Sequence, residues 1–134
     1  MYTITFSRVA QGNYTISDNN DNRLLCIGSI LVDTDLRKRV RKALYYAAEI
    51  GLEEAKQFET TLNALHLSQL DPETIIIKLV TQTVPKIHYE TDIPLEEFIA
   101  LIEDYEDAIE SDLRTITITR IQDSFELTAS TYLE

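Results

Sequence analysis

Apolar and polar residues alternate over residues 2–9, and this period of two is typical of a half-buried strand. A Gln11-Gly12-Asn13 turn leads to a short return strand over residues 14–17, so the two are expected to form a hairpin. After the turn-forming residues 18–22 comes an apolar run over residues 24–32. Its length and its Ile and Val content favour a buried strand, in which Gly28 marks a bulge or a close backbone approach.

The middle of the chain changes to a helical period. Residues 36–50 are predicted to form a helix, capped by Asp33-Thr34-Asp35 and ended by Gly51. Its core face is expected to comprise Leu36, Val40, Ala43, Leu44, Ala47 and Ile50. A second helix is predicted over residues 52–65, from the helical spacing of Leu52, Ala55, Phe58, Leu62 and Leu65.

The next segments favour strands. Asp71-Pro72-Glu73 suits a helix start as well as a turn, but residues 74–83 are dense in β-branched side chains and predict a strand. Residues 86–90 extend or follow that strand after Pro85. Residues 113–121 and 124–131 both alternate, and a turn at Gln122-Asp123 would join them as a hairpin.

Residues 94–112 predict an amphipathic helix with one apolar face and one face made almost entirely of acids. Its apolar face comprises Leu95, Phe98, Ile99, Ile102, Tyr105 and Ile109, with Leu101 and Ala108 beside them. The opposite side carries the acids Glu96, Glu97, Glu103, Asp104 and Asp107, with Glu110 at its margin. Glu106 is the exception, because it falls inside the apolar arc. Pro94 suits the first turn, and Asp92 is placed to help cap it.

This order of elements predicts an α+β fold, with a mostly antiparallel sheet and about three helices packed on one face. The length of 134 residues suits a single domain over residues 1–134. A hydrophobic content of 44% and a charged content of 26% are ordinary for a globular protein.

Charge narrows the possible partners. The formal net charge is −11, which disfavours binding to nucleic acid and favours a cationic partner. No signal-peptide pattern and no apolar stretch near the roughly 18–20 residues of a membrane span is present. With a single cysteine, Cys26, the chain has no internal disulfide. We therefore expect a cytoplasmic protein without membrane contact.

The acids are concentrated in one window. Residues 90–112 contain ten acids and no Lys or Arg. In a helix, like charges three or four positions apart each cost about 0.2–0.5 kcal/mol, and acids in the last turn face the negative end of the helix dipole. Such a face either solubilises the protein or is kept because a basic partner neutralises it.

A second charged feature is the cluster of five cations at Arg37, Lys38, Arg39, Arg41 and Lys42. Phosphate binding is disfavoured there, because the chain is acidic and no glycine-rich or aromatic loop is interleaved. If the two helices pack together, these cations neutralise the acidic helix internally, and the acidic face then needs no partner. The sequence leaves this question open.

No residue pattern indicates an enzyme, a metal site or a cofactor. Residues 18–22 lack the glycine and the bidentate glutamate of a calcium loop. His66, expected just after a helix, and His88, on or beside a strand, are not in a ligand spacing. Cys26 lies in an apolar run, where its pKa should be raised rather than lowered. Of the adjacent Tyr45 and Tyr46, Tyr45 faces outward, either as ordinary surface or as an interface anchor.

The leading hypothesis is a non-catalytic, acidic protein that binds and neutralises a basic protein, as bacterial immunity proteins inhibit nuclease toxins. The expected partner-binding residues are Glu96, Glu97, Glu103, Asp104, Asp107, Glu110 and Asp112. The alternative is a structural or adaptor subunit that assembles through an apolar helix or a sheet edge. A small-ligand-binding or enzymatic domain has no sequence feature in its favour.

Overall fold

The computed structural model describes residues 2–60, 63–81, 86–122 and 124–130. They form three helices and eight antiparallel strands, which confirms the predicted α+β class. The elements are β1 (Tyr2–Ala10), β2 (Asn13–Asn19), α1 (Asn22–Leu31), α2 (Thr34–Glu49), β3 (Lys56–Glu59), β4 (Asn63–Asp71), β5 (Thr74–Thr81), β6 (His88–Pro94), α3 (Leu95–Glu110), β7 (Thr115–Ile121) and β8 (Ser124–Ser130).

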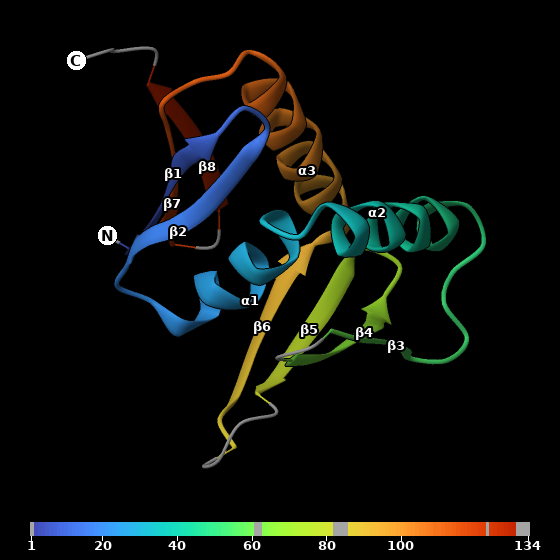
Figure 1. The fold of residues 1–134 in the computed structure, drawn as a ribbon. Coiled ribbons are helices and arrows are strands. Elements are labelled where there is room, and N and C mark those ends of the chain that lie inside the picture. Colours follow the sequence, from blue (N-terminus) through green and yellow to red (C-terminus); the bar gives the residue numbers. More distant parts are fainter. Residues whose placement is uncertain (1, 61–62, 82–85, 123, 131–134) are drawn as a thin grey trace.

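The strands form two four-stranded sheets instead of the single sheet expected. The first has the order β2-β1-β7-β8 and unites two hairpins from far apart in the sequence, with Ile4 opposite Ile118 and Phe6 opposite Ile116. The second, β3-β4-β5-β6, follows the chain order. Figure 1 shows the first sheet at the left, the second at the lower right, and the helices between and above them.

The run at residues 24–32 is a helix, α1, so the predicted buried strand is wrong. Asp21 caps it by accepting a hydrogen bond from the Arg23 amide at 3.2 Å. Helix α1 packs against strands of both sheets, so most of it is buried. The residues along its more exposed side are Asn22, Leu25 and Ser29. Because one of these three residues is the apolar Leu25, the helical period is weak in the sequence. Gly28 therefore marks neither a strand bulge nor a close approach of another backbone; instead, the end of the Ile4 side chain packs on it, and a Cβ there would lie 2.5 Å from Ile4 Cδ1.

The predicted helix over residues 52–65 is also wrong, because this segment contains β3 and the start of β4. Phe58 and Leu65, seven positions apart, are directly opposite each other across this hairpin. A spacing of seven fits two helical turns and this hairpin equally well, so the pattern was misleading. His66 therefore lies within β4 and not after a helix.

The other predicted elements are confirmed within the described residues, with local differences. Asp71-Pro72-Glu73 belongs to the turn between β4 and β5, where the Asp71 carboxylate accepts from the Glu73 amide at 2.9 Å. Asp92 does not cap α3; instead, the Leu95 amide donates to the Glu73 carbonyl at 2.7 Å. Ile50, placed on the core face of α2, is 68% exposed. The predicted positions 62, 82–83, 85, 123 and 131 lie outside the described residues.

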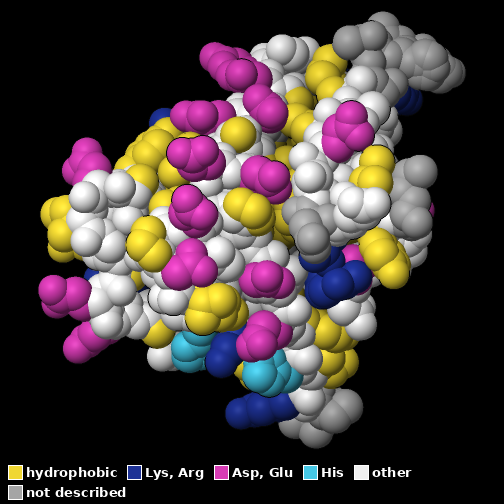
Figure 2. Space-filling model, turned by 180° about the vertical axis from the view of Figure 1, so that it is seen from behind, with side chains coloured by type: hydrophobic (Ala, Val, Ile, Leu, Met, Phe, Trp, Pro, Cys, Tyr) yellow, Lys and Arg dark blue, Asp and Glu magenta, His cyan; other side chains and the backbone are white. Residues whose placement is uncertain are grey.

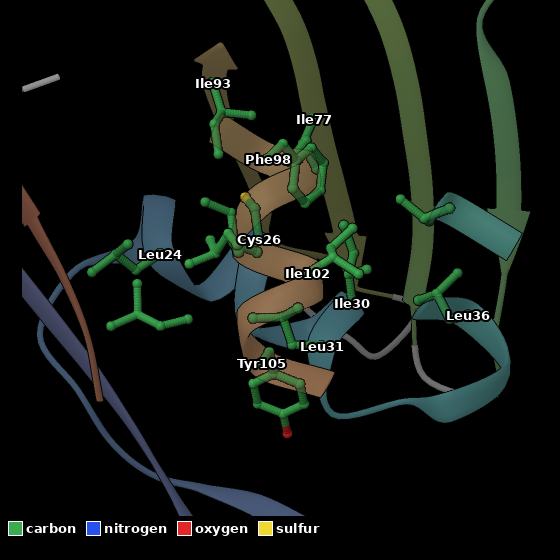
Figure 3. Packing of buried hydrophobic residues seen from close by; sticks show 14 of the residues in the cluster. Leu24, Cys26, Ile30, Leu31, Leu36, Ile77, Ile93, Phe98, Ile102 and Tyr105 are labelled. Carbon is green, nitrogen blue, oxygen red and sulfur yellow. The ribbon is translucent and has the colours of Figure 1, made fainter. Parts of the chain in front are cut away.

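One hydrophobic cluster connects both sheets and all three helices. Figure 3 shows its centre, where Cys26, Ile30 and Leu31 of α1 lie among side chains of α3 and of the second sheet. From α3, Phe98 and Ile102 enter this centre and are fully buried. The buried side of α3 is thereby fixed, and its opposite side faces solvent.

Candidate partner-binding surface

The predicted amphipathic helix at residues 94–112 is α3, and its apolar side is buried. The buried residues are Leu95, Phe98, Leu101, Ile102, Tyr105 and Ala108, with Ile99 and Ile109 partly buried beside them. The Tyr105 ring meets Phe6 of β1 edge to face, at 5.2 Å between ring centroids. The rotation of α3 is therefore set by its core contacts, and these direct the acids outward.

The basic cluster of α2 does meet α3, through Glu106. Arg37, whose side chain is only 5% exposed, donates to Glu106 Oε2 at 3.3 Å and to the Leu31 carbonyl at 2.6 Å. Arg41 donates to the other carboxylate oxygen of Glu106, and this carboxylate raises the pKa of Arg41. The Arg37 guanidinium also lies 5.4 Å from the centroid of the Tyr105 ring, so the pair is built into the contact between the helices.

This internal pairing leaves most of the acidic side untouched. The third arginine of the cluster, Arg39, pairs within α2 with Asp35 at 3.1 Å. The only further α2 contact to an α3 acid that is resolved among the described residues is from the Tyr45 hydroxyl, which donates to Glu103 Oε2 at 2.8 Å. The acid that receives the arginines is the one inside the apolar arc. The question left open by the sequence is thereby answered: the helices meet, but their ion pairs involve only Glu106.

The predicted binding residues divide into three groups. The first group is exposed and forms no ion pair with a described residue; it consists of Glu96, Glu103, Asp104, Asp107 and Glu110. Glu97 is partly buried, and its Oε2 has no hydrogen-bond partner among the described residues. In Figure 2 acidic side chains run in a column over the middle of the molecule, with apolar side chains beside them.

Asp112 differs from the other predicted residues. It lies beyond the end of α3 in the left-handed region, at φ +57°, where its amide donates to the Ile109 carbonyl at 3.0 Å. Its Oδ2 accepts from Arg8 of β1 at 2.6 Å. This aspartate ends the helix and ties it to the first sheet, so it is the predicted residue least available to a partner.

Sequence reasoning missed a hollow beside the acidic column. It has a volume of about 330 Å³, opens to solvent, and lies between α3 and β8. Its lining consists of Asp104, Asp107, Ala108, Ser111, Leu113, Leu127 and Ala129. Two carboxylates thus line this shallow hollow together with apolar side chains of Ala108, Leu113, Leu127 and Ala129. The alternation of β8 indicated an apolar face, but only the pairing of β7 with β8 brings that face beside α3.

Other chemistry is not supported by the described residues. Among them, no group of three or more His, Cys, Asp or Glu side chains is placed to hold a metal ion. Cys26 is fully buried, and burial raises the pKa of its thiol to about 12, as the sequence predicted in direction. Of the helices described, none has both the length and the apolar character required to cross a bilayer.

Comparisons with protein-family models, with curated proteins and with solved structures find no match for this chain. The surface of α3 is therefore the feature from which a function can be inferred. That surface offers carboxylates free of internal cations and an adjoining apolar hollow. Such a surface can bind cationic groups.

Proposed function

We propose that this protein binds a basic protein through the acidic outer side of α3 and inhibits it, in the manner of an immunity protein that neutralises a nuclease toxin. The observation that carries the proposal is the unequal use of cations. Arg37 and Arg41 both pair with Glu106. The exposed carboxylates of Glu103, three positions earlier, and of Asp107, one position later, form no ion pair with a described residue.

A face of uncompensated carboxylates attracts a basic partner over a distance and so guides it during association. Uncompensated carboxylates raise the rate at which a basic partner associates, and this effect weakens with salt. Carboxylates held along a helix also resemble the spaced negative charges that a nuclease binds in a phosphate backbone. Inhibition follows because a partner occupied in this way cannot bind its substrate.

The hollow between α3 and β8 offers an apolar surface beside the carboxylates, on which a side chain of the partner can pack. Lysine and arginine side chains have long apolar stems that cover hydrophobic surface while the charged head stays in contact with water or an anion. A stem of this kind fits over Leu113 and Leu127, with its head at Asp104 or Asp107. The hollow therefore provides a position for a cationic anchor residue of the partner.

The test is affinity capture from the native host with three forms of the tagged protein. The first is the wild type and the second carries Glu103→Lys, Asp104→Lys and Asp107→Lys. The third is a matched control that carries Glu49→Lys, Glu53→Lys and Glu54→Lys. These three glutamates are exposed and lie outside α3, so both variants change the net charge equally. Circular dichroism confirms that each variant is folded.

The proposal predicts a stoichiometric basic protein that is retained by the wild type and the control, lost with the α3 variant, and released by high salt. Its activity should fall to zero on titration with one equivalent of the wild-type protein. If both variants lose the partner equally, the binding depends on the net charge of the protein and not on the α3 surface. A partner that survives high salt and the α3 reversal would favour the adaptor alternative, for which the exposed Ile50 and Leu70 are available.

A further inference from the structure

A separate hollow of opposite charge lies between α2 and β3, with a volume of about 260 Å³. Its lining consists of Arg39, Lys42, Ala43, Tyr46, Lys56 and Phe58. The walls are thus mainly aromatic and aliphatic, three cations stand around them, and no carboxylate of the described residues lines the hollow. This arrangement is unexpected in a chain whose formal net charge is −11.

The three cations come from two elements and differ in how they are held. Arg39 is fixed by its ion pair with Asp35 and by the Phe58 ring, whose centroid lies 5.5 Å from the guanidinium carbon. Lys42 and Lys56 are exposed, and neither forms an ion pair with a described residue. A lysine on an edge strand such as β3 can serve to prevent edge-to-edge pairing. That role does not explain why Lys42 of α2 converges on the same hollow.

We propose that this hollow binds a small organic anion with a flat apolar body, such as an aryl phosphate or an aryl carboxylate. The lysines supply charge to the anionic group, and the Phe58 and Tyr46 rings cover the flat body. A volume of about 260 Å³ suits one aromatic ring with its anionic substituent. An inorganic anion would leave the apolar walls unused, and an aromatic cation would be repelled by the rim.

This site is independent of the proposed partner-binding surface. None of its lining residues belongs to α3, and the two arginines that pair with Glu106 do not line it. Tyr46, half exposed at 50%, is one wall of the hollow, while its neighbour Tyr45 turns to Glu103. The two adjacent tyrosines therefore serve different surfaces.

The experiment titrates phenyl phosphate into ¹⁵N-labelled protein and follows backbone amide shifts. We expect saturable shifts confined to residues 39–46 and 56–58, with a Kd on the order of 1 mM, which is reasonable for a ligand of this size. Three comparison compounds separate the contributions. Inorganic phosphate carries only the charge, phenol only the ring, and benzylamine the ring with the opposite charge, and each should bind at least about tenfold more weakly.

Charge-reversal variants locate the site. Lys42→Glu and Lys56→Glu should each lower the affinity for phenyl phosphate at least about tenfold. Lys38→Glu is the matched control, because Lys38 is exposed on the same helix but does not line the hollow. Since all three lysines are exposed, none of the substitutions removes a core side chain. The site is refuted by absence of saturable shifts, by shifts elsewhere, by equally tight inorganic phosphate, or by an equal loss in the Lys38→Glu control.

Discussion

Glu106→Gln and Asp107→Asn remove one negative charge from adjacent positions of α3, yet we expect them to change the free energy of unfolding in opposite directions. Glu106 is 22% exposed at its side chain and accepts from both Arg37 and Arg41. Removing one partner of a fully buried ion pair costs about 3–5 kcal/mol. Because Glu106 is partly solvated and glutamine keeps one acceptor oxygen, we expect a loss of about 2 kcal/mol.

Asp107 has the opposite environment. It lies four positions after Glu103 and three after Asp104, and each like-charge contact costs about 0.2–0.5 kcal/mol. It also lies in the last turn of α3, near the negative end of the helix dipole. Removing its charge should therefore stabilise the protein by about 0.5–1 kcal/mol at low ionic strength.

Urea unfolding followed by circular dichroism measures both effects as a shift of the midpoint at constant slope. With a slope of about 2 kcal/mol per molar urea, Glu106→Gln should lower the midpoint by about 1 M. Asp107→Asn should raise it by about 0.3–0.5 M. In about 1 M NaCl the effect of Asp107→Asn should nearly vanish, because exposed charges are screened within a few ångströms, whereas most of the Glu106→Gln effect should remain.

Two results would refute this reasoning. If Asp107→Asn also destabilises the protein, the outer acids are neutralised internally, and the proposal of a basic partner loses its supporting observation. If Glu106→Gln leaves the midpoint unchanged, the ion pairs between α2 and α3 contribute nothing to stability. Each variant thus tests one part of the reasoning, the free outer acids with Asp107→Asn and the ion pairs between the helices with Glu106→Gln.

Two further predictions concern the core. Gly28→Ala should destabilise the protein by about 1 kcal/mol in urea unfolding, because the new Cβ would lie 2.5 Å from Ile4 Cδ1. The Ile4→Val variant lacks that Cδ1 atom. In this background Gly28→Ala should instead stabilise α1 by up to about 1 kcal/mol, because alanine favours a helix over glycine. Burial raises the pKa of the Cys26 thiol and of the Tyr105 hydroxyl to about 12, so both lose their protons more readily in the unfolded chain. The free energy of unfolding should then be level below about pH 9 and fall from there to about pH 12. In urea midpoints measured from pH 8 upward, Cys26→Ser should move the onset of that fall to higher pH. An unchanged onset would contradict the role of Cys26.

Local patterns were sufficient for the elements that have one buried and one exposed side. The period of α3, the cap and terminal glycine of α2, and the alternation of β1, β7 and β8 can each be read from neighbouring residues in the sequence, because one side of each element is more buried than the other. For the same reason the sequence placed most of the acids of α3 on its solvent side. The raised pKa of Cys26 also followed from its apolar neighbours in the sequence.

Tertiary structure decided what depends on more than one layer or on distant residues. Helix α1 packs against strands of both sheets, so its exposed side is narrow and the helical period that would have revealed it is weak. The pairing of Phe58 with Leu65 across a hairpin has the same spacing as a helix face, and only the strand partners distinguish them. Arg8 reaches Asp112 across about a hundred positions of sequence, and Arg37 and Arg41 reach Glu106. Packing therefore decides which acids stay free for a partner. Two side chains neutralise each other when they are close in space, even if they are far apart in the sequence.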